Sequence, residues 1–219
     1  MTRNAILEAT LQCLVDIGYA QTTTEKIVRQ AGVSRGAMTH HFKSRAEVFD
    51  AAAKYIIEKR AEEYDRMIGA VSVRPGTLPT LQDMKVTMAI LQKYYASSTY
   101  VSLNELMRGA RTDAGFRRTM VPLEKSLDKR ISDSMLKHFP FLSHVEETRE
   151  VLMDLILSSL QSIAVDMAPH LKGARLQRLL DLLSAVAARE IDSAYKTATG
   201  GKTPRLIKAK TTQPEGDAA

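Results

Sequence analysis

Basic and hydroxyl side chains gather between residues 23 and 45, where their types and spacing suit contact with a polyanion. The basic residues there are Lys26, Arg29, Arg35, Lys43 and Arg45, and the only acidic residue is Glu25. The adjacent His40 and His41 add groups that can bond phosphate oxygens. A localised positive segment is typical of nucleic-acid binding, although a solvated basic surface would carry the same charge.

Metal and enzyme chemistry are the alternatives for these side chains. Adjacent residues such as His40 and His41 point to different faces of a helix, and no set of Cys, Asp or Glu ligands accompanies them. His144 and His170 lie beside expected helix ends without an obvious partner. The sequence contains no phosphate-binding Gly loop, HExxH motif or nucleophile elbow. We therefore predict no enzyme activity, no metal and no cofactor.

The composition is that of a soluble globular protein. The chain has 219 residues, of which 44% are hydrophobic and 26% charged. No apolar run approaches the roughly 18 residues of a membrane span, and polar residues interrupt the N-terminus, so neither a membrane contact nor a signal peptide is predicted. Cys13 is the only cysteine, which excludes a disulfide within the chain and fits a cytoplasmic location. The net charge of +6 is concentrated in residues 1–60 and 196–219.

Helical periodicity recurs along the chain while strand signals are nearly absent, so the predicted fold class is all-α. Thr22 or Thr23 can cap a second helix that Gly32 stops, after a first helix that ends at Gly18. The first expected helix covers 3–17. Those after the second cover 34–42, 45–67, about 80–97, 101–110, 113–138, 145–168 and 173–196. Pro122 should kink or split the helix at 113–138.

Residues 23–42 have the pattern of a helix-turn-helix, in which a tight turn joins two short helices. Gly32 supplies the turn and Ser34 can cap the second helix. Inward-facing positions are Ile27, Ala31, Val33, Ala37, Met38 and Phe42. Outward-facing positions, where the major groove of DNA would lie, are Arg35, Gly36, Thr39 and His40. Arg35 can make a bidentate contact to guanine or bind phosphate, and Gly36 allows a close approach.

This segment resembles the DNA-binding domain of the TetR (tetracycline-repressor) family. The matching residues are Gly18, Tyr19, Thr22, Thr23, Ile27, Ala31, Gly32, Val33, Ser34, Gly36, His41, Phe42, Ser44 and Arg45. The resemblance implies that Thr23, His41 and Arg45 contact phosphates, and that Arg35, Thr39 and His40 lie at or near the bases. The predicted DNA-binding set is completed by Thr22, Thr24, Gly36 and Lys43. The chain departs from the family pattern at Thr39, where Tyr is usual, and at Val28, where Ala is usual.

The resemblance also implies a division into domains. Residues 1–48 would form a three-helix DNA-binding domain, 49–196 a helical effector-binding and dimerisation domain, and 197–219 a basic tail that its composition predicts to be disordered. The expected function is a sequence-specific transcriptional repressor that binds a pseudo-palindromic double-stranded operator and is released by a small, largely apolar ligand. The alternative is a helical regulator of the same fold that acts mainly through protein partners or without an inducer.

Two features of the C-terminal half bear on assembly and on the ligand. The helices near 145–168 and 173–196 have wide apolar faces, which predict a homodimer interface, with packing inside the monomer as the alternative. Methionine and aromatic residues in the middle of this half can line a pocket for the unknown effector, although plain core is the alternative. The predicted lining is Met84, Met88, Tyr95, Tyr100, Asn104, Met107, Phe116 and Met120.

Overall fold

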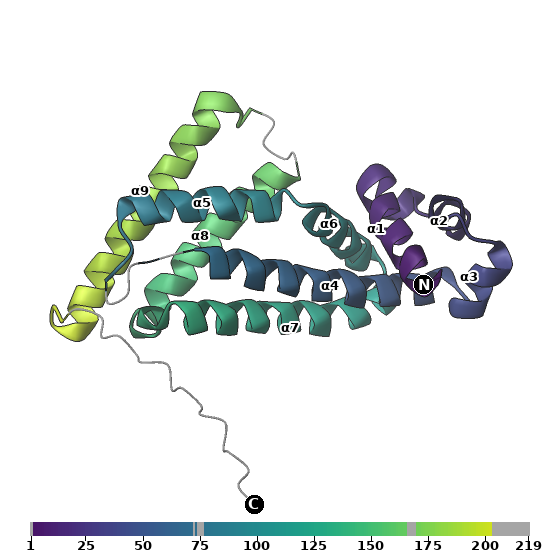
Figure 1. The fold of residues 1–219 in the computed structure, drawn as a ribbon, viewed down its shortest axis with the longest axis horizontal. Coiled ribbons are helices and arrows are strands. Elements are labelled where there is room, and N and C mark those ends of the chain that lie inside the picture. The colour runs from purple at the N-terminus through teal and green to yellow at the C-terminus, as the bar shows by residue number, and fades with distance from the viewer. Residues whose placement is uncertain (1, 72, 74–76, 166–169, 203–219) are drawn as a thin grey trace, which may run out of the picture.

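The computed structural model describes residues 2–71, 73, 77–165 and 170–202, and within these ranges it contains helices and no strand. The helices are α1 (Thr2–Gln21), α2 (Thr24–Ala31), α3 (Arg35–His41), α4 (Arg45–Ala70), α5 (Leu81–Tyr95), α6 (Ser98–Thr112), α7 (Ala114–His138), the 3-10 turn η1 (Pro140–His144), α8 (Glu146–Ala164) and α9 (Gly173–Thr199). The all-α prediction is confirmed. In Figure 1, α1 to α3 form one end of the molecule and α9 lies at the other.

The helices of the N-terminal end are delimited by residues whose type suits the position. The backbone of Gly18 has φ 75°, which interrupts α1 near its end, as the sequence predicts. Thr23, rather than Thr22, caps α2 by accepting a hydrogen bond from the Lys26 N–H. Ser34 and Ser44 cap α3 and α4 in the same way. Gly32 ends α2 in the left-handed region at φ 65°.

The long helices α4 and α7 lie side by side and run along the long axis of the molecule (Figure 1). The predicted split at Pro122 is wrong, because α7 runs through this proline from Ala114 to His138. Met120 and Leu127 are buried on either side of Pro122 and pack against α4. We attribute the continuity of α7 to this packing, which outweighs the missing backbone hydrogen bond.

Other helix boundaries differ from the prediction by a few residues. Helix α6 begins at Ser98, three residues earlier than expected, and α9 extends to Thr199. Residues 197–199, which the composition places in the disordered tail, are therefore helical. The helix ends at Gly200. Residues 166–169, expected at the end of the helix at 145–168, and 203–219 of the tail lie outside the described residues. Each described helix is too short or too polar to span a bilayer.

Two large apolar clusters stabilise the fold. The first joins α1, α2, α3 and the start of α4 to α6 and α7 through Leu14, Phe49, Leu106 and Phe116. The second joins α4 and α5 to α8 and α9, with Met88 near its centre. The first cluster extends from residues 1–48 into the second predicted domain, so the N-terminal end, made of α1 to α3, is packed directly on α6 and α7. The boundary at 48/49 stays a prediction.

Candidate DNA-binding interface

Helix α3 presents a polar outer face on a buried apolar base. Met38 and Phe42 are buried beneath it, as the sequence predicts. The exposed residues are Arg35, Gly36, Thr39, His40 and His41. The short helix therefore offers a continuous surface of cationic, hydroxyl and imidazole groups, with a glycine at position 36 where no side chain limits the approach of another molecule.

Two of these exposed side chains have partners within the protein. Arg35 forms an ion pair with Glu25 of α2, and both side chains are largely exposed. The Thr39 hydroxyl donates to the Arg35 carbonyl oxygen at 2.8 Å. An exposed ion pair contributes little to stability, so Arg35 can leave Glu25 for another anion at small cost. The Thr39 hydroxyl can still accept a hydrogen bond while it donates to the backbone.

The flanks of α3 carry further predicted contact residues. Thr23 and Lys43 are exposed, and Thr24 is half-buried. The Lys43 backbone N–H donates to Glu47 at 2.8 Å, which fixes the chain between α3 and α4. These side chains stand at the start of α2 and just after α3, so their cationic and hydroxyl groups border the outer face of α3.

Thr22 does not belong to this surface. Its side chain is fully buried, and its hydroxyl donates to the Gly18 carbonyl oxygen at 2.7 Å. The prediction that Thr22 contacts DNA is therefore corrected. Its hydroxyl closes the turn that follows the interruption at Gly18 and is satisfied there.

Arg45 also points into the protein rather than outward. Its Nε donates to the Thr22 carbonyl oxygen at 2.9 Å, and its terminal nitrogen donates to the Tyr19 carbonyl oxygen at 2.7 Å. The guanidinium lies over the Phe49 ring at 4.1 Å and the Tyr19 ring at 4.8 Å. The phosphate contact that the family resemblance implies for Arg45 has no support in this arrangement. Arg45 instead joins the start of α4 to the end of α1.

Tyr19 connects the N-terminal end, made of α1 to α3, to the rest of the molecule. Its backbone N–H donates to the Glu105 carboxylate of α6 at 3.0 Å. Its ring stacks on Phe49 with centroids 4.9 Å apart and on Phe116 with centroids 5.7 Å apart. Glu105 gives no signal in the sequence, because its partner Tyr19 lies 86 residues away. Phe116, expected in the ligand pocket, packs here instead.

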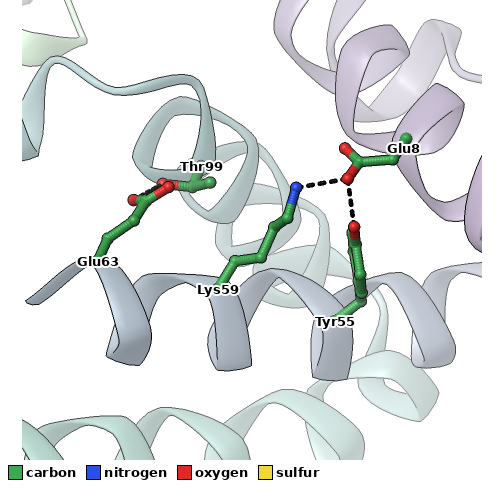
Figure 2. Close-up of polar contacts among 5 residues, drawn as sticks. All are labelled: Glu8, Tyr55, Lys59, Glu63 and Thr99. Atoms are coloured by element: carbon green, nitrogen blue, oxygen red, sulfur yellow. Dashed lines mark hydrogen bonds and ion pairs between the residues drawn. The ribbon is translucent and has the colours of Figure 1, made fainter. Parts of the chain in front are cut away.

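A row of polar contacts along α4 adds to this connection, as Figure 2 shows. The Glu8 carboxylate of α1 accepts hydrogen bonds from Tyr55 and Lys59, and Glu63 accepts one from Thr99 of α6. Burial raises the pKa of the Glu8 carboxyl, but the hydrogen bonds from Lys59 and Tyr55 and the Lys59 charge outweigh that effect. The pKa of Glu8 therefore lies below its ordinary value, and the carboxylate stays charged near neutral pH.

The C-terminal half contains an apolar cavity of about 90 Å³ between α4, α5, α7, η1, α8 and α9. Two of the predicted ligand-binding residues, Met84 and Met88, line it. The other six do not. Tyr95 and Tyr100 lie in the second apolar cluster, Met107, Phe116 and Met120 belong to the first, and Asn104 accepts a hydrogen bond from Arg108 on the same helix. Lining residues missed from the sequence include Ile68 of α4, Leu152 and Ile156 of α8, and Ile191 of α9.

Tyr95 and Tyr100 enclose a buried arginine instead of a ligand site. The Arg60 guanidinium lies 3.7 Å from the centre of the Tyr94 ring. It also lies within 5.5 Å of the centres of the Tyr95 and Tyr100 rings. It donates to the Tyr94 carbonyl oxygen at 3.0 Å, where α5 ends. Burial lowers the pKa of Arg60 and raises that of Tyr94 to about 12. Arg60 thus joins the middle of α4 to the junction of α5 and α6.

A short exposed helix with a cationic outer face, set on a second short helix by a glycine turn, defines a helix-turn-helix DNA-binding protein. The model of the bacterial regulatory proteins of the tetR family matches residues 6–52. An uncharacterised HTH-type transcriptional regulator of Mycobacterium tuberculosis is 27% identical over 82% of this chain and 91% of its own length. The HTH-type transcriptional repressor AcnR of Corynebacterium diphtheriae is 26% identical over 84% of this chain and 90% of its own.

Solved structures show the same fold at lower identity. A TetR-family transcriptional regulator from Streptomyces coelicolor superposes with a TM-score of 0.62 at 17% identity, covering 91% of this chain and 89% of that one. One from Marinobacter aquaeolei has a TM-score of 0.59 at 12% identity, covering 86% and 94%. The chain therefore has an N-terminal domain like that of TetR-family regulators, and it resembles such regulators over most of its length. It is a DNA-binding transcription regulator and not an enzyme.

Proposed function

We propose that this regulator is a repressor that binds a pseudo-palindromic operator as a homodimer in the cytoplasm and is released by a small, largely apolar ligand. The observation that carries the proposal is the outer face of α3, where Arg35, Thr39 and His40 are exposed above buried Met38 and Phe42. The name of the Corynebacterium relative, a transcriptional repressor, favours repression over activation. A two-fold dimer matches a palindromic site because each α3 reads one half-site.

Operator binding is tested with Arg35→Ala and Glu25→Gln. Arg35→Ala should weaken binding to the DNA that flanks the protein's own gene by about 1–3 kcal/mol. Glu25→Gln should strengthen it a few-fold, because Arg35 then loses its competing partner. Glu62→Gln removes the same charge from an exposed position on α4, far from α3, and is the matched control. Gel-shift titrations at two salt concentrations measure all three.

The outcomes of this titration separate the two candidate functions. Equal affinities for Arg35→Ala and the parent would mean that α3 is not the reading face. The absence of any salt-sensitive shift with the parent protein would contradict operator binding and favour the alternative, a regulator that acts through protein partners.

The proposed dimer uses apolar side chains that the monomer leaves exposed on α8 and α9. Val151 and Leu155 on α8 are 69% and 47% exposed, and Leu182 on α9 is 60% exposed. By contrast, Leu160 and Leu180 on the same helices are buried within the monomer. Exposed large apolar residues on neighbouring helices are typical of an interface, and two such helices from each subunit would form a four-helix bundle.

Leu182→Glu should therefore give a monomer. In the dimer the new charge would be buried without a partner, whereas in the isolated subunit it would stay in solvent. Val121→Glu is the control, since Val121 is 41% exposed on α7. It should leave the dimer intact. Light scattering on both variants measures the assembly. An intact dimer for Leu182→Glu would place the interface elsewhere.

The apolar cavity supports the proposed ligand response. Tyr64 and Ile68 of α4 line it, together with Val71 just after the helix, and the same helix begins at Arg45 beside the helix-turn-helix. A small tilt of α4 can therefore link occupancy of the cavity to the position of α3. A ligand shifts this equilibrium only by its preference for one state, so operator affinity should fall by roughly 5- to 150-fold when the cavity is filled.

A further inference from the structure

A groove of about 210 Å³ lies between α2 and α3. Four residues of the predicted DNA-binding set line it, namely Thr24, Arg35, Thr39 and Lys43. The groove therefore opens on the surface that α3 presents to DNA. Val28, which with Thr39 departs from the family pattern, lines it as well. Its volume is ample for a methyl group and the edge of a base, because a water-sized group needs only about 10–15 Å³ by the same measure.

The lining of this groove is charged at its mouth and apolar farther in. The side chains of Glu25 and Arg35 are 70% and 77% exposed and pair with each other. Met38 and Phe42 are buried, and Val28 is half-buried against the same apolar cluster. The Glu25 carboxylate disfavours a phosphate inside the groove, whereas an uncharged apolar group gains by leaving water there. The groove thus suits part of a base better than the DNA backbone.

Thr39 has no hydrogen-bond donor left for a base. Its hydroxyl donates to the Arg35 carbonyl oxygen at 2.8 Å, and a hydroxyl has only one proton to give. The same bond holds the side chain in one rotamer, because a β-branched residue has few alternatives in a helix. The side chain is exposed, and its remaining group is the γ-methyl. Thr39 therefore offers an incoming base a methyl group and an oxygen that can only accept.

We propose that this groove reads a thymine of the operator, whose C5-methyl group enters it and contacts the Thr39 methyl group beside Val28. This inference rests on the proposed function, since it names a base that the outer face of α3 recognises. The thymine methyl is the apolar group that base edges present in the major groove, where they otherwise offer donors and acceptors. The acceptor atoms of the bases gain nothing from Thr39, because its proton is already donated.

The test replaces each thymine of the bound DNA by uracil, which keeps the ring and its pairing and lacks only the C5-methyl group. The DNA is the site that footprinting defines in the region flanking the protein's own gene. Each replacement is made first in one half-site and then in both. Gel-shift titrations of the full chain should find a position at which uracil weakens binding by about 3- to 5-fold in one half-site and about 10- to 25-fold in both, the range for burial of one methyl-sized group per half-site.

Two variants separate the methyl group of Thr39 from its hydroxyl, and both should fold because the side chain is exposed. Thr39→Ser keeps the hydroxyl and its bond to the Arg35 carbonyl oxygen but lacks the methyl group. In this variant uracil at the sensitive position of both half-sites should weaken binding by less than about 2-fold, since the contacting partner is already gone. Thr39→Val keeps a methyl group in the same shape and lacks the hydroxyl. It should retain the parental ratio of affinities for thymine and uracil DNA.

The inference is overturned if uracil weakens binding of the parent at no position, or if Thr39→Ser retains the parental ratio. It is also overturned if Thr39→Val loses affinity for the thymine DNA and Thr39→Ser keeps it, because the Thr39 oxygen would then accept from an amino group of adenine or cytosine. Failure of the proposed function looks different. If the parent gives no salt-sensitive shift with this DNA, operator binding fails and the inference falls with it. If the parent binds the operator and no uracil matters, operator binding stands and the thymine contact fails.

Discussion

Arg45→Ala should lower the free energy of unfolding by about 3 kcal/mol and weaken operator binding without changing its salt dependence. The variant loses two hydrogen bonds from a charged donor to the carbonyl oxygens of Tyr19 and Thr22. Each such bond contributes about 1.5–3 kcal/mol, and partial exposure of Arg45 places the sum at the lower end. Urea unfolding measures the stability, and gel-shift titrations over a range of salt measure the binding.

Lys43→Ala is the matched control for Arg45→Ala. Lys43 stands two residues earlier, and its side chain is exposed. Its removal should leave the unfolding free energy within about 0.5 kcal/mol of the parent. It should also lower the salt slope of operator binding by about one, as expected for a phosphate contact. If Arg45→Ala behaved in this way and kept its stability, Arg45 would contact phosphate as the family resemblance implies, and its inward position would not persist on DNA.

The local features of the DNA-binding end could be predicted because their causes lie close together in the sequence. Ser34 and Ser44 cap helices that start at the next residue, so each hydrogen bond spans only three residues. Met38 and Phe42 are four residues apart, which is the spacing of neighbours on one side of a helix, and both are buried. Helical periodicity and capping fix both results before any tertiary contact forms.

The orientation of Arg45 could not be predicted in the same way. An arginine at the first turn of a helix beside a DNA-reading motif fits a phosphate contact and an internal contact equally well. The choice depends on the carbonyl oxygens of Tyr19 and Thr22, which the turn after Gly18 directs toward it. Thr22 is a similar case, because both it and Thr23 have hydroxyls and only the folded turn shows which one is buried.

The apolar cavity was the least predictable part of the molecule. A methionine or aromatic residue at helical spacing faces inward in either case, and the sequence does not show whether a cavity or another side chain lies opposite. Met84 and Met88 line the cavity, whereas Met120, on α7, packs against α4 at the DNA-binding end. Ile156 of α8 gave no signal either, since its position beside the cavity depends on how η1 and α8 pack against α5 and α9.

Gly109→Val on α6 should lower the free energy of unfolding by about 3 kcal/mol. A Cβ atom at position 109 would lie 2.5 Å from the Tyr19 ring. That ring cannot easily move, because it stacks between Phe49 and Phe116. Overpacking of this kind typically costs about 1–3 kcal/mol, and we expect the upper end because the Tyr19 backbone is also bonded to Glu105 and Arg45. Operator binding should fall as well, since a displaced Tyr19 loosens α1 and the start of α4.

Gly69→Val is the control, because a Cβ atom at that helical position on α4 has no neighbour closer than 3.8 Å. It should change the unfolding free energy by less than about 0.5 kcal/mol. The decisive measurement is a double-mutant cycle with Tyr19→Ala, which removes the ring that valine would strike. In that background Gly109→Val should cost at least 1 kcal/mol less than in the parent, since contacting residues are not additive. An equal cost in both backgrounds would mean that the substitution acts through the helix itself, and that the contact between Tyr19 and Gly109 does not join the DNA-binding end to α6.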